Sequence, residues 1–162
     1  MKAPLVIAFT KVKLPNGWLG NMAPFPVQHK GLWYPTTEAL FQALRFNDPE
    51  IREQIRTSRS PMAAKMLARK HDGLMTIVRQ SDADLDNMRF VLKRKLEDHP
   101  KLVSMLVDTN DAKIIEDCTK RPHGSGLFWG AALQPDGTWK GENWLGRLWE
   151  ELRQKEAKMY NC

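Results

Sequence analysis

The sequence predicts a mainly α-helical domain of the α+β class, a single compact unit of about six helices and a few short strands that covers residues 1–162. Two features of the sequence predict this class. Capping residues followed by proline or an acid recur along the chain, as they do where helices begin. Apolar residues then return every three or four positions, which is typical of helices that pack on a core.

The first predicted elements are strands. Residues 5–9 form a short apolar run of the kind found in buried strands. Residues 14–35 contain several prolines and glycines, which favour a loop, and His29-Lys30-Gly31 predicts a short hairpin within it.

Three helices are predicted next, each after a side chain that can cap it. Thr36, Asp48 and Ser60 can each accept a hydrogen bond from a free amide of the first turn, and proline directly follows Asp48 and Ser60. The predicted helices cover residues 36–46, 48–58 and 60–71.

The remaining elements follow mainly from apolar spacing. A helix is predicted after Ser81 and a short helix after Pro100. The apolar residues spaced for the first of these are Leu85, Met88, Leu92 and Leu96. Beyond them we predict a strand within residues 112–118, a loop over 120–137 and a final helix over 143–155.

Composition narrows the classes of partner and compartment. The net charge of +6 and the pI of about 9.4 favour anionic ligands, although no basic tail or known nucleic-acid-binding module is present. Two cysteines give no disulfide framework and four histidines lack metal-ligand spacing, so we expect a reducing, cytoplasmic setting and no metal. The apolar run at residues 5–9 is too short to span a membrane, and no membrane partner is expected.

Glu38 is the first candidate for chemistry. It falls in the first turn of the helix predicted after Thr36, and Leu40 and Phe41 follow it at inward-facing positions. Its carboxylate is therefore expected to lie beside an aromatic wall. An acid in a first turn also offsets the helix dipole without any other role, and that alternative stays open.

Two later segments are also suited to contact a ligand. Glycines around Phe128 and Trp129 let the backbone approach a ligand closely, and the indole offers a flat stacking surface. Asn143 lies between Gly141 and Gly146 and can cap the final helix with its own side chain. The chain has no phosphate-binding P-loop, no serine-hydrolase elbow and no zinc-protease motif.

Five segments, taken in order, resemble the NADAR superfamily, whose members include YbiA-like N-glycosidases of riboflavin intermediates and hydrolases that remove ADP-ribose from guanine bases. The resemblance covers most of the chain and implies one NADAR-like domain over residues 1–162. The segments are Gly20-Asn21-Met22 with Pro24-Phe25, Trp33 to Ala43, Pro61 through Ala64-Lys65 to Ala68-Arg69, Phe128-Trp129-Gly130, and Gly141-x-Asn143-x-Leu145-Gly146.

The chain also departs from the family's pattern. Ala39 stands where the family usually has histidine, Arg45 where lysine often occurs, and Ala68 where glycine normally precedes arginine. An acid commonly found just before the Trp-Gly pair is missing, because Gly126 and Leu127 stand there. The charge at the site is therefore expected to differ from that of the best-known relatives.

The resemblance implies an N-glycosyl hydrolase that needs no cofactor, with Glu38 as its catalytic carboxylate. In this hypothesis the carboxylate stabilises positive charge on the ribose and activates water. Asparagines hold ribose hydroxyls or the leaving group, an indole stacks, and basic side chains hold phosphate. The implied substrate-binding residues are Asn21, Trp129, Gly130, Asn143, Gly146, Lys65 and Arg69.

The preferred substrate is ADP-ribose joined to a nucleobase-type nitrogen, such as guanine in nucleic acid, so ADP-ribosylated DNA or RNA is an expected partner. Electrostatics suit an early riboflavin intermediate, a ribosylaminopyrimidine phosphate, equally well. Two alternatives without catalysis stay open. One is a module that binds ADP-ribose without cleaving it, and the other is an interaction protein whose tryptophans only pack the core.

Overall fold

A computed structural model describes residues 5–160, and its contacts divide the chain into two compact units. The helical unit is Asn21–His99. The strand-and-helix unit combines Met1–Gly20 with Pro100–Cys162, of which residues 5–20 and 100–160 are described.

The predicted class is confirmed, because the described chain consists of seven α-helices and a few short strands. Within residues 5–160, no helix combines the length and apolar composition needed to cross a membrane. The α-helices are α1 Thr37–Ala43, α2 Pro49–Arg56, α3 Pro61–Lys70, α4 Asp82–Asp98, α5 Lys101–Val107, α6 Gly126–Trp129 and α7 Trp144–Tyr160. The strands are β1 Val6–Phe9, β2 Val27–His29, β3 Leu32–Tyr34, β4 Lys113–Glu116, β5 Ala132–Leu133 and β6 Trp139–Lys140, and short 3-10 turns cover Gly17–Leu19 and Asp72–Leu74.

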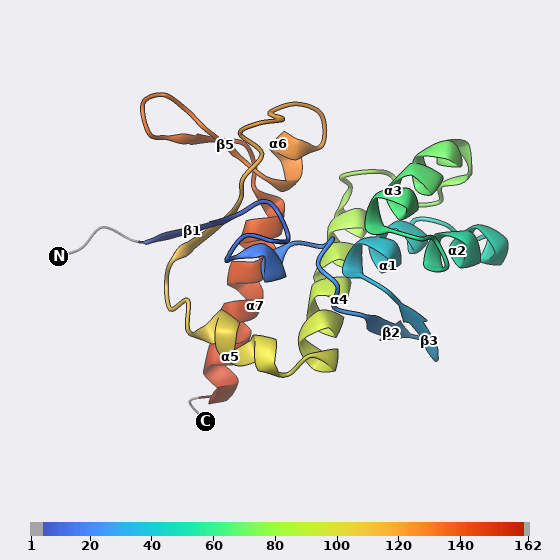
Figure 1. The fold of residues 1–162 in the computed structure, drawn as a ribbon, viewed down its shortest axis with the longest axis horizontal. Coiled ribbons are helices and arrows are strands. Elements are labelled where there is room, and N and C mark those ends of the chain that lie inside the picture. Colours follow the sequence, from blue (N-terminus) through green and yellow to red (C-terminus); the bar gives the residue numbers. More distant parts are fainter. Residues whose placement is uncertain (1–4, 161–162) are drawn as a thin grey trace. The chain divides into compact units, whose positions relative to one another are not determined.

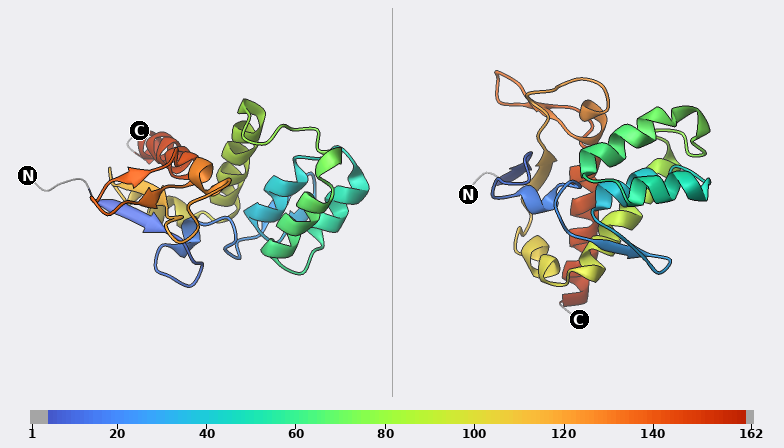
Figure 2. Two further views of the ribbon diagram at one scale, coloured as in Figure 1. Left: turned by 90° about the horizontal axis from the view of Figure 1, so that it is seen from above. Right: turned by 45° about the vertical axis from the view of Figure 1, so that its right-hand side comes forward.

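Helix α1 is the central element of the helical unit (Figure 1). All its residues are buried, and it contacts α2, α3, α4 and the two strands β2 and β3. Figure 2 shows α1, α2 and α3 side by side. Because α1 is covered on several sides, polar side chains on it must find hydrogen-bond partners inside the protein.

The predicted caps begin the helices of this unit. Thr36 Oγ1 accepts a hydrogen bond from the Ala39 amide at 3.1 Å, and Ser60 Oγ accepts one from the Ala63 amide at 3.0 Å. Asp48 caps α2 in the same way. Each cap satisfies an amide that has no partner within its helix, which fixes where the helix starts.

The predicted hairpin is also confirmed. Strands β2 and β3 pair antiparallel, with Val27 opposite Tyr34. The two residues between them, Lys30 and Gly31, have φ angles of 50° and 78°. Positive φ at both turn positions matches the right-handed twist of the strands, and glycine adopts it without a steric penalty.

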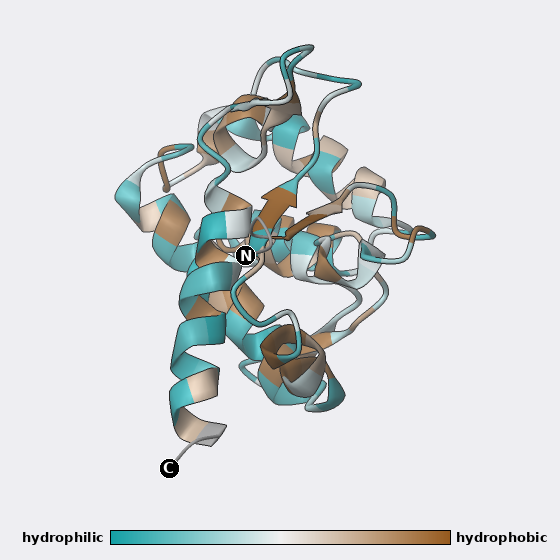
Figure 3. Cartoon of the chain, turned by 90° about the vertical axis from the view of Figure 1, so that its left-hand side faces the viewer, coloured by the Kyte–Doolittle hydropathy of each residue, from teal (hydrophilic) through white to brown (hydrophobic). Residues whose placement is uncertain are grey.

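The strand-and-helix unit is built around a parallel pair of strands and the long helix α7. Strand β1 pairs with β4, and α7 packs on β4. Trp149 on α7 is fully buried, and its Nε1 donates to the Leu19 carbonyl at 3.0 Å. The face of α7 visible in Figure 3 is mainly hydrophilic. The apolar residues of this helix that face the core are buried, and they are Leu145, Leu148, Trp149 and Leu152.

Two sequence predictions about this unit are wrong in part. The predicted loop over residues 120–137 contains α6 and β5, and the final helix continues past residue 155 to Tyr160. The Ala131 amide donates to the Glu116 carbonyl, and the Cys118 amide donates to the Ala131 carbonyl, both at 2.9 Å. Such pairing between distant segments stabilises extended backbone in a stretch whose own sequence favours a loop.

Candidate active site

Glu38, the predicted catalytic residue, lies in the first turn of α1 and has only 8% of its surface exposed. Its backbone amide donates to the Asn21 carbonyl at 3.0 Å, so the start of the helix is tied to the preceding segment. The carboxylate is therefore held inside the helical unit by a capped and anchored helix start.

A chain of buried side-chain hydrogen bonds leads away from Glu38. Gln42 Nε2 donates to Glu38 Oε1 at 3.2 Å, and Arg45 Nη1 donates to Gln42 Oε1 at 3.2 Å. Arg45 Nε and Nη2 donate to the two carboxylate oxygens of Asp84 on α4, at 2.9 and 2.7 Å. Arg45 is 5% exposed and Asp84 is fully buried, so they form a buried, bidentate ion pair.

Burial raises the pKa of the Glu38 carboxyl above its ordinary value, because the charged form loses hydration. The hydrogen bond from Gln42 and the positive charges of Lys65 and Arg45 lower this pKa but do not cancel the effect of burial. Glu38 therefore keeps its proton to a higher pH than an exposed glutamate. A carboxyl whose pKa is raised by burial is suited to a general acid–base role.

Lys65 and Arg69 lie one turn apart on α3, the helix that contacts α1. Lys65 is half-buried, and its charge acts on the Glu38 carboxylate. Arg69 is exposed on the surface of the helical unit. The structure thus brings Lys65 to the predicted catalytic acid and leaves Arg69 in solvent.

Asn21 is buried next to the start of α1. Its Oδ1 accepts a hydrogen bond from Thr37 Oγ1 at 2.9 Å, while its Nδ2 lies 3.2 Å from the sulfur of Met88. A thioether is a weak hydrogen-bond acceptor. The Asn21 amide therefore loses only a weak hydrogen bond when its NH₂ group turns from Met88 to a ligand hydroxyl.

Asn143 lies in the strand-and-helix unit, directly before α7, and its side chain does not have the predicted capping role. The side-chain hydrogen bonds that the structure gives it both reach β4. Oδ1 accepts from the Glu116 amide at 3.0 Å, and Nδ2 donates to the Ile114 carbonyl at 2.8 Å. Its backbone has a φ of 55°, a left-handed conformation that asparagine tolerates better than most residues. The side chain thus provides hydrogen-bond partners for two backbone groups of β4, the Glu116 amide and the Ile114 carbonyl.

Gly130 and Gly146 allow close approaches of the backbone. A Cβ on Gly146 would lie 2.0 Å from the Ile114 oxygen, and a Cβ on Gly130 would lie 2.3 Å from the Glu116 oxygen. Both distances are far shorter than atomic contacts permit, so glycine is required for α7 and the end of α6 to reach β4. A direct contact of either residue with substrate stays a prediction.

Trp129 is the last residue of α6 and has 9% of its surface exposed. Its ring meets that of Phe128 edge-on, with centroids 4.8 Å apart, and Phe128 lies 6.3 Å from the Trp144 ring. These contacts hold the indole in a cluster of aromatic rings. Stacking of Trp129 on a substrate stays a prediction.

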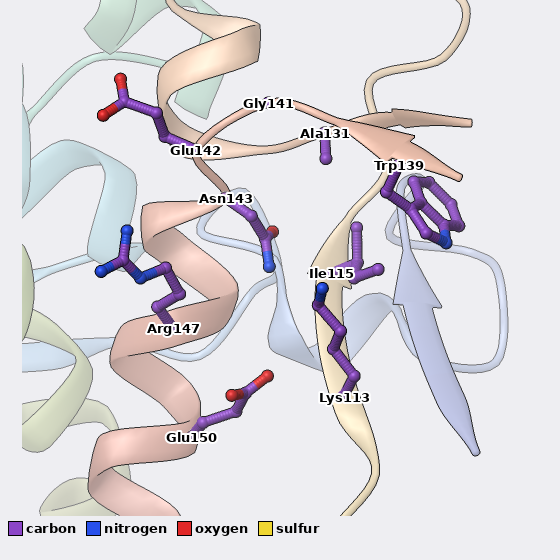
Figure 4. Close-up of a pocket in the computed structure, with 9 residues that line it drawn as sticks. All are labelled: Lys113, Ile115, Ala131, Trp139, Gly141, Glu142, Asn143, Arg147 and Glu150. Atoms are coloured by element: carbon purple, nitrogen blue, oxygen red, sulfur yellow. The ribbon is translucent and has the colours of Figure 1, made fainter. Parts of the chain in front are cut away.

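A hollow of about 290 Å³ lies beside Asn143 in the strand-and-helix unit (Figure 4). Basic and acidic side chains both line it, so its charge does not favour an anion over a cation. In Figure 4, Lys113 and Glu150 extend into the space between α7 and β4 and the Trp139 ring lies at its far side, while Glu142 and Arg147 point away. The lining residues are Lys113, Ile115, Ala131, Trp139, Gly141, Glu142, Asn143, Arg147 and Glu150.

Sequence reasoning missed the chain of hydrogen bonds that runs from Glu38 through Gln42 and Arg45 to Asp84. Gln42 lies within one of the segments that resemble the family, Arg45 stands out there only as a departure from the family's pattern, and no motif in the sequence includes Asp84. The spacing of Glu38, Gln42 and Arg45 is that of one helix face, and it could have indicated their contact. The pairing with Asp84 joins α4 to the end of α1, which spacing within one helix does not show. Among residues 5–160, no group of three or more His, Cys, Asp or Glu side chains could hold a metal ion.

Known proteins are similar to this chain both in sequence and in fold. The NADAR domain matches residues 8–155. N-glycosidase YbiA of Escherichia coli (strain K12) is 33% identical over 152 residues, which cover 94% of this chain and 89% of that protein. The NMR structure of the E. coli protein YbiA gives a TM-score of 0.78 at 31% identity, covering 99% of this chain and 89% of that one. Riboflavin biosynthesis protein VVA0006 of Vibrio vulnificus (strain YJ016) is 27% identical over 154 residues, which cover 90% of this chain and 38% of that protein.

These similarities confirm the resemblance seen in the sequence. The family match covers nearly all of the described residues, and the similarity to YbiA extends over most of both proteins in sequence and in fold. The chain therefore belongs to the NADAR domain family.

Proposed function

We propose that this protein hydrolyses the N-glycosidic bond between a phosphorylated ribose, with ADP-ribose preferred, and a nucleobase-type nitrogen such as that of guanine in nucleic acid. Family membership and the relatives named N-glycosidase YbiA make it a hydrolase that acts on N-glycosyl compounds. The identity of the sugar phosphate and of the leaving base is the part that we propose.

One observation carries the chemistry: Glu38 is buried, has a raised pKa and is held by a hydrogen bond from Gln42. As the bond from the ribose C1′ to nitrogen breaks, its electron pair leaves with nitrogen and positive charge develops on C1′ and the ring oxygen. A nearby carboxylate stabilises that charge. Water then adds to C1′ and gives one proton to the carboxylate, the leaving nitrogen takes up a proton from solvent, and the carboxyl returns its proton to solvent.

The basic side chains support a phosphorylated sugar. Lys65 is half-buried on α3 near Glu38, and Arg69 lies one turn further on the same helix. A cation beside the catalytic acid can bind a phosphate oxygen while it lowers the cost of ionising the acid. The weakly held amide of Asn21 is suited to bind a ribose hydroxyl.

A second substrate deserves a direct test because the V. vulnificus relative is named a riboflavin biosynthesis protein. An early intermediate of that pathway, a ribosylaminopyrimidine phosphate, also joins ribose phosphate to nitrogen. Charge alone does not separate it from an ADP-ribosylated base.

The test is a paired assay of the purified full chain. One reaction contains a DNA oligonucleotide with ADP-ribosylated guanine, and the other contains the riboflavin intermediate. The released sugar phosphate is identified by mass, and Glu38→Gln protein serves as the control in both reactions. We expect cleavage of the ADP-ribosylated DNA by the wild type at a rate far above that of the control.

Other outcomes would replace this proposal. Cleavage of the riboflavin intermediate alone would assign the second substrate. Saturable binding of ADP-ribose without cleavage of either compound would support a binding module, and the absence of both binding and cleavage would support an interaction protein.

A further inference from the structure

The buried ion pair at the end of α1 lies two hydrogen bonds away from Glu38. Arg45 follows the last turn of α1, and its carbonyl accepts a hydrogen bond from the Thr76 amide at 2.8 Å. Its guanidinium carbon lies 4.5 Å from the centre of the Phe41 ring. Asp84, which receives two of its N–H groups, also accepts from the Gln80 amide at 2.9 Å. Backbone, ring and carboxylate contacts therefore fix the guanidinium in one position.

Arginine only donates hydrogen bonds, and this decides which way the Gln42 amide faces. The Gln42 atom next to Arg45 Nη1 must be the carbonyl oxygen. The NH₂ group of the same amide must then face Glu38, where it donates to Oε1. With the amide reversed, its oxygen would face the carboxylate oxygen, which disfavours the charged form of Glu38.

We infer that Arg45, clamped by Asp84, is a positioning residue that sets the orientation of the Gln42 amide and thereby holds the Glu38 carboxylate for the reaction. This inference rests on the proposed function of Glu38. Among the described residues, the carboxylate accepts one side-chain hydrogen bond, at Oε1, and we assign Oε2 to substrate or water.

In this chain, lysine in place of Arg45 cannot make the same three hydrogen bonds. Three N–H groups of Arg45 are used at once, two by Asp84 and one by Gln42. A guanidinium offers these donors in a rigid plane, whereas an ammonium is a compact charge on a flexible stem. Arg45→Lys keeps a positive charge beside Asp84 and so avoids a buried acid without a partner. Arg45→Lys therefore removes the planar arrangement of N–H donors but retains the positive charge.

The charged groups that act on the Glu38 carboxylate are Lys65 on α3 and Arg45, whose own charge is paired with Asp84 on α4. A change in the titration of Glu38 can therefore come from charge or from the Gln42 amide. Gln42→Met separates these causes, because it removes the amide while Arg45 and Asp84 stay paired.

The experiment measures the titration midpoint of Glu38 by NMR of the carboxyl carbon in protein labelled at glutamate, with Glu38→Gln to assign the signal. The variants are Arg45→Lys, Gln42→Met and the double variant. Arg94→Lys is the matched control, because Arg94 also pairs with an aspartate of the helical unit, Asp98, at 2.8 Å. If Arg45→Lys does not fold, Asp84→Asn takes its place, since it loosens the same guanidinium.

We expect Arg45→Lys and Gln42→Met each to raise the midpoint by roughly half a pH unit or more, and the double variant to match Gln42→Met alone. Arg94→Lys should leave it unchanged. The acidic limb of the kcat/KM profile should move in the same direction, with a fall in kcat and little change in KM. A purely structural ion pair would lower the unfolding temperature without moving the midpoint, and that result would overturn the inference.

The inference and the proposed function fail in different ways. An Arg45→Lys effect that persists in full on top of Gln42→Met would show that the guanidinium does not act through the amide. Normal turnover by Glu38→Gln would instead remove Glu38 from the reaction, while the NMR titration would still decide whether Arg45 orients Gln42.

Discussion

The starts of α1 and α7 both carry buried polar side chains, but they use them differently. At α1, the Glu38 carboxylate is held by another side chain, Gln42, and its burial raises its pKa. At α7, Asn143 gives both its side-chain groups to the backbone of β4. Asn143 completes the hydrogen bonds of a strand, and its contact with substrate stays a prediction, whereas the buried acid at α1 is held through one oxygen and can take part in a reaction.

The largest expected effect is on catalysis at the start of α1. Glu38→Gln removes the charge and the basicity of the carboxylate while keeping its shape, so we expect a loss of roughly 10²–10⁴-fold in kcat. Steady-state kinetics on the substrate identified above measure it, and circular dichroism checks the fold. Turnover within about threefold of the wild type would contradict the role of Glu38, because general acid–base catalysis is worth far more than that.

The second-largest effect is expected on stability, at the start of α7. Gly146→Ala places a methyl group 2.0 Å from the Ile114 oxygen, so α7 must move away from β4. We expect a loss of about 3 kcal/mol or more in the free energy of unfolding, measured in urea.

Gly73→Ala is the matched control for that change, because a Cβ at Gly73 has no atom within 4 Å. Its effect should stay within about 0.5 kcal/mol. Equal stability of the two variants would show that the contact between α7 and β4 relaxes easily.

A smaller effect is expected from the cation near Glu38. Lys65→Met should raise KM for a phosphorylated substrate by roughly tenfold, since one charge-assisted contact to phosphate is lost. Lys70→Met changes an exposed lysine at the end of the same helix and should leave KM unchanged. The salt dependence of kcat/KM should weaken only in the first variant. An equal response of both variants would point to general surface charge.

The smallest effect is on the pH dependence of stability. The pKa of Glu38 is raised in the folded state, so the folded protein binds more protons than the unfolded chain at pH values above the ordinary pKa of 4.5. The stabilisation from protonated Glu38 is complete below that value and is lost as pH rises through the folded pKa. Urea unfolding of Glu38→Gln should therefore show a modest gain in the free energy of unfolding over the wild type, and this gain should grow as pH rises above 4.5.

Glu53→Gln is the control of opposite sign. The hydrogen bond from Arg56 lowers the pKa of Glu53, so any dependence that it contributes runs the other way. A gain for Glu38→Gln that does not vary with pH would mean that burial does not raise the pKa of this acid.

The local sequence predicted the helix starts of the helical unit and the position of Glu38 in its candidate site. Thr36, Asp48 and Ser60 were expected to cap helices and do so, since a cap depends on a residue and the few that follow it. Glu38 was placed in a first turn for the same reason. The prediction of a long loop over residues 120–137 was wrong in part, because α6 and β5 lie within it and are stabilised by contacts with residues far away in the sequence.

The sequence by itself determined the mainly helical class, the helix starts and the place of Glu38 in the first turn of α1, because these follow from spacing over a few positions. Only the tertiary structure decided that Asp84 would clamp Arg45 and that Asn143 would bond β4 rather than its own helix. Those choices depend on which polar groups are buried together. Burial brings together groups that lie far apart in the chain, and each must then find a partner.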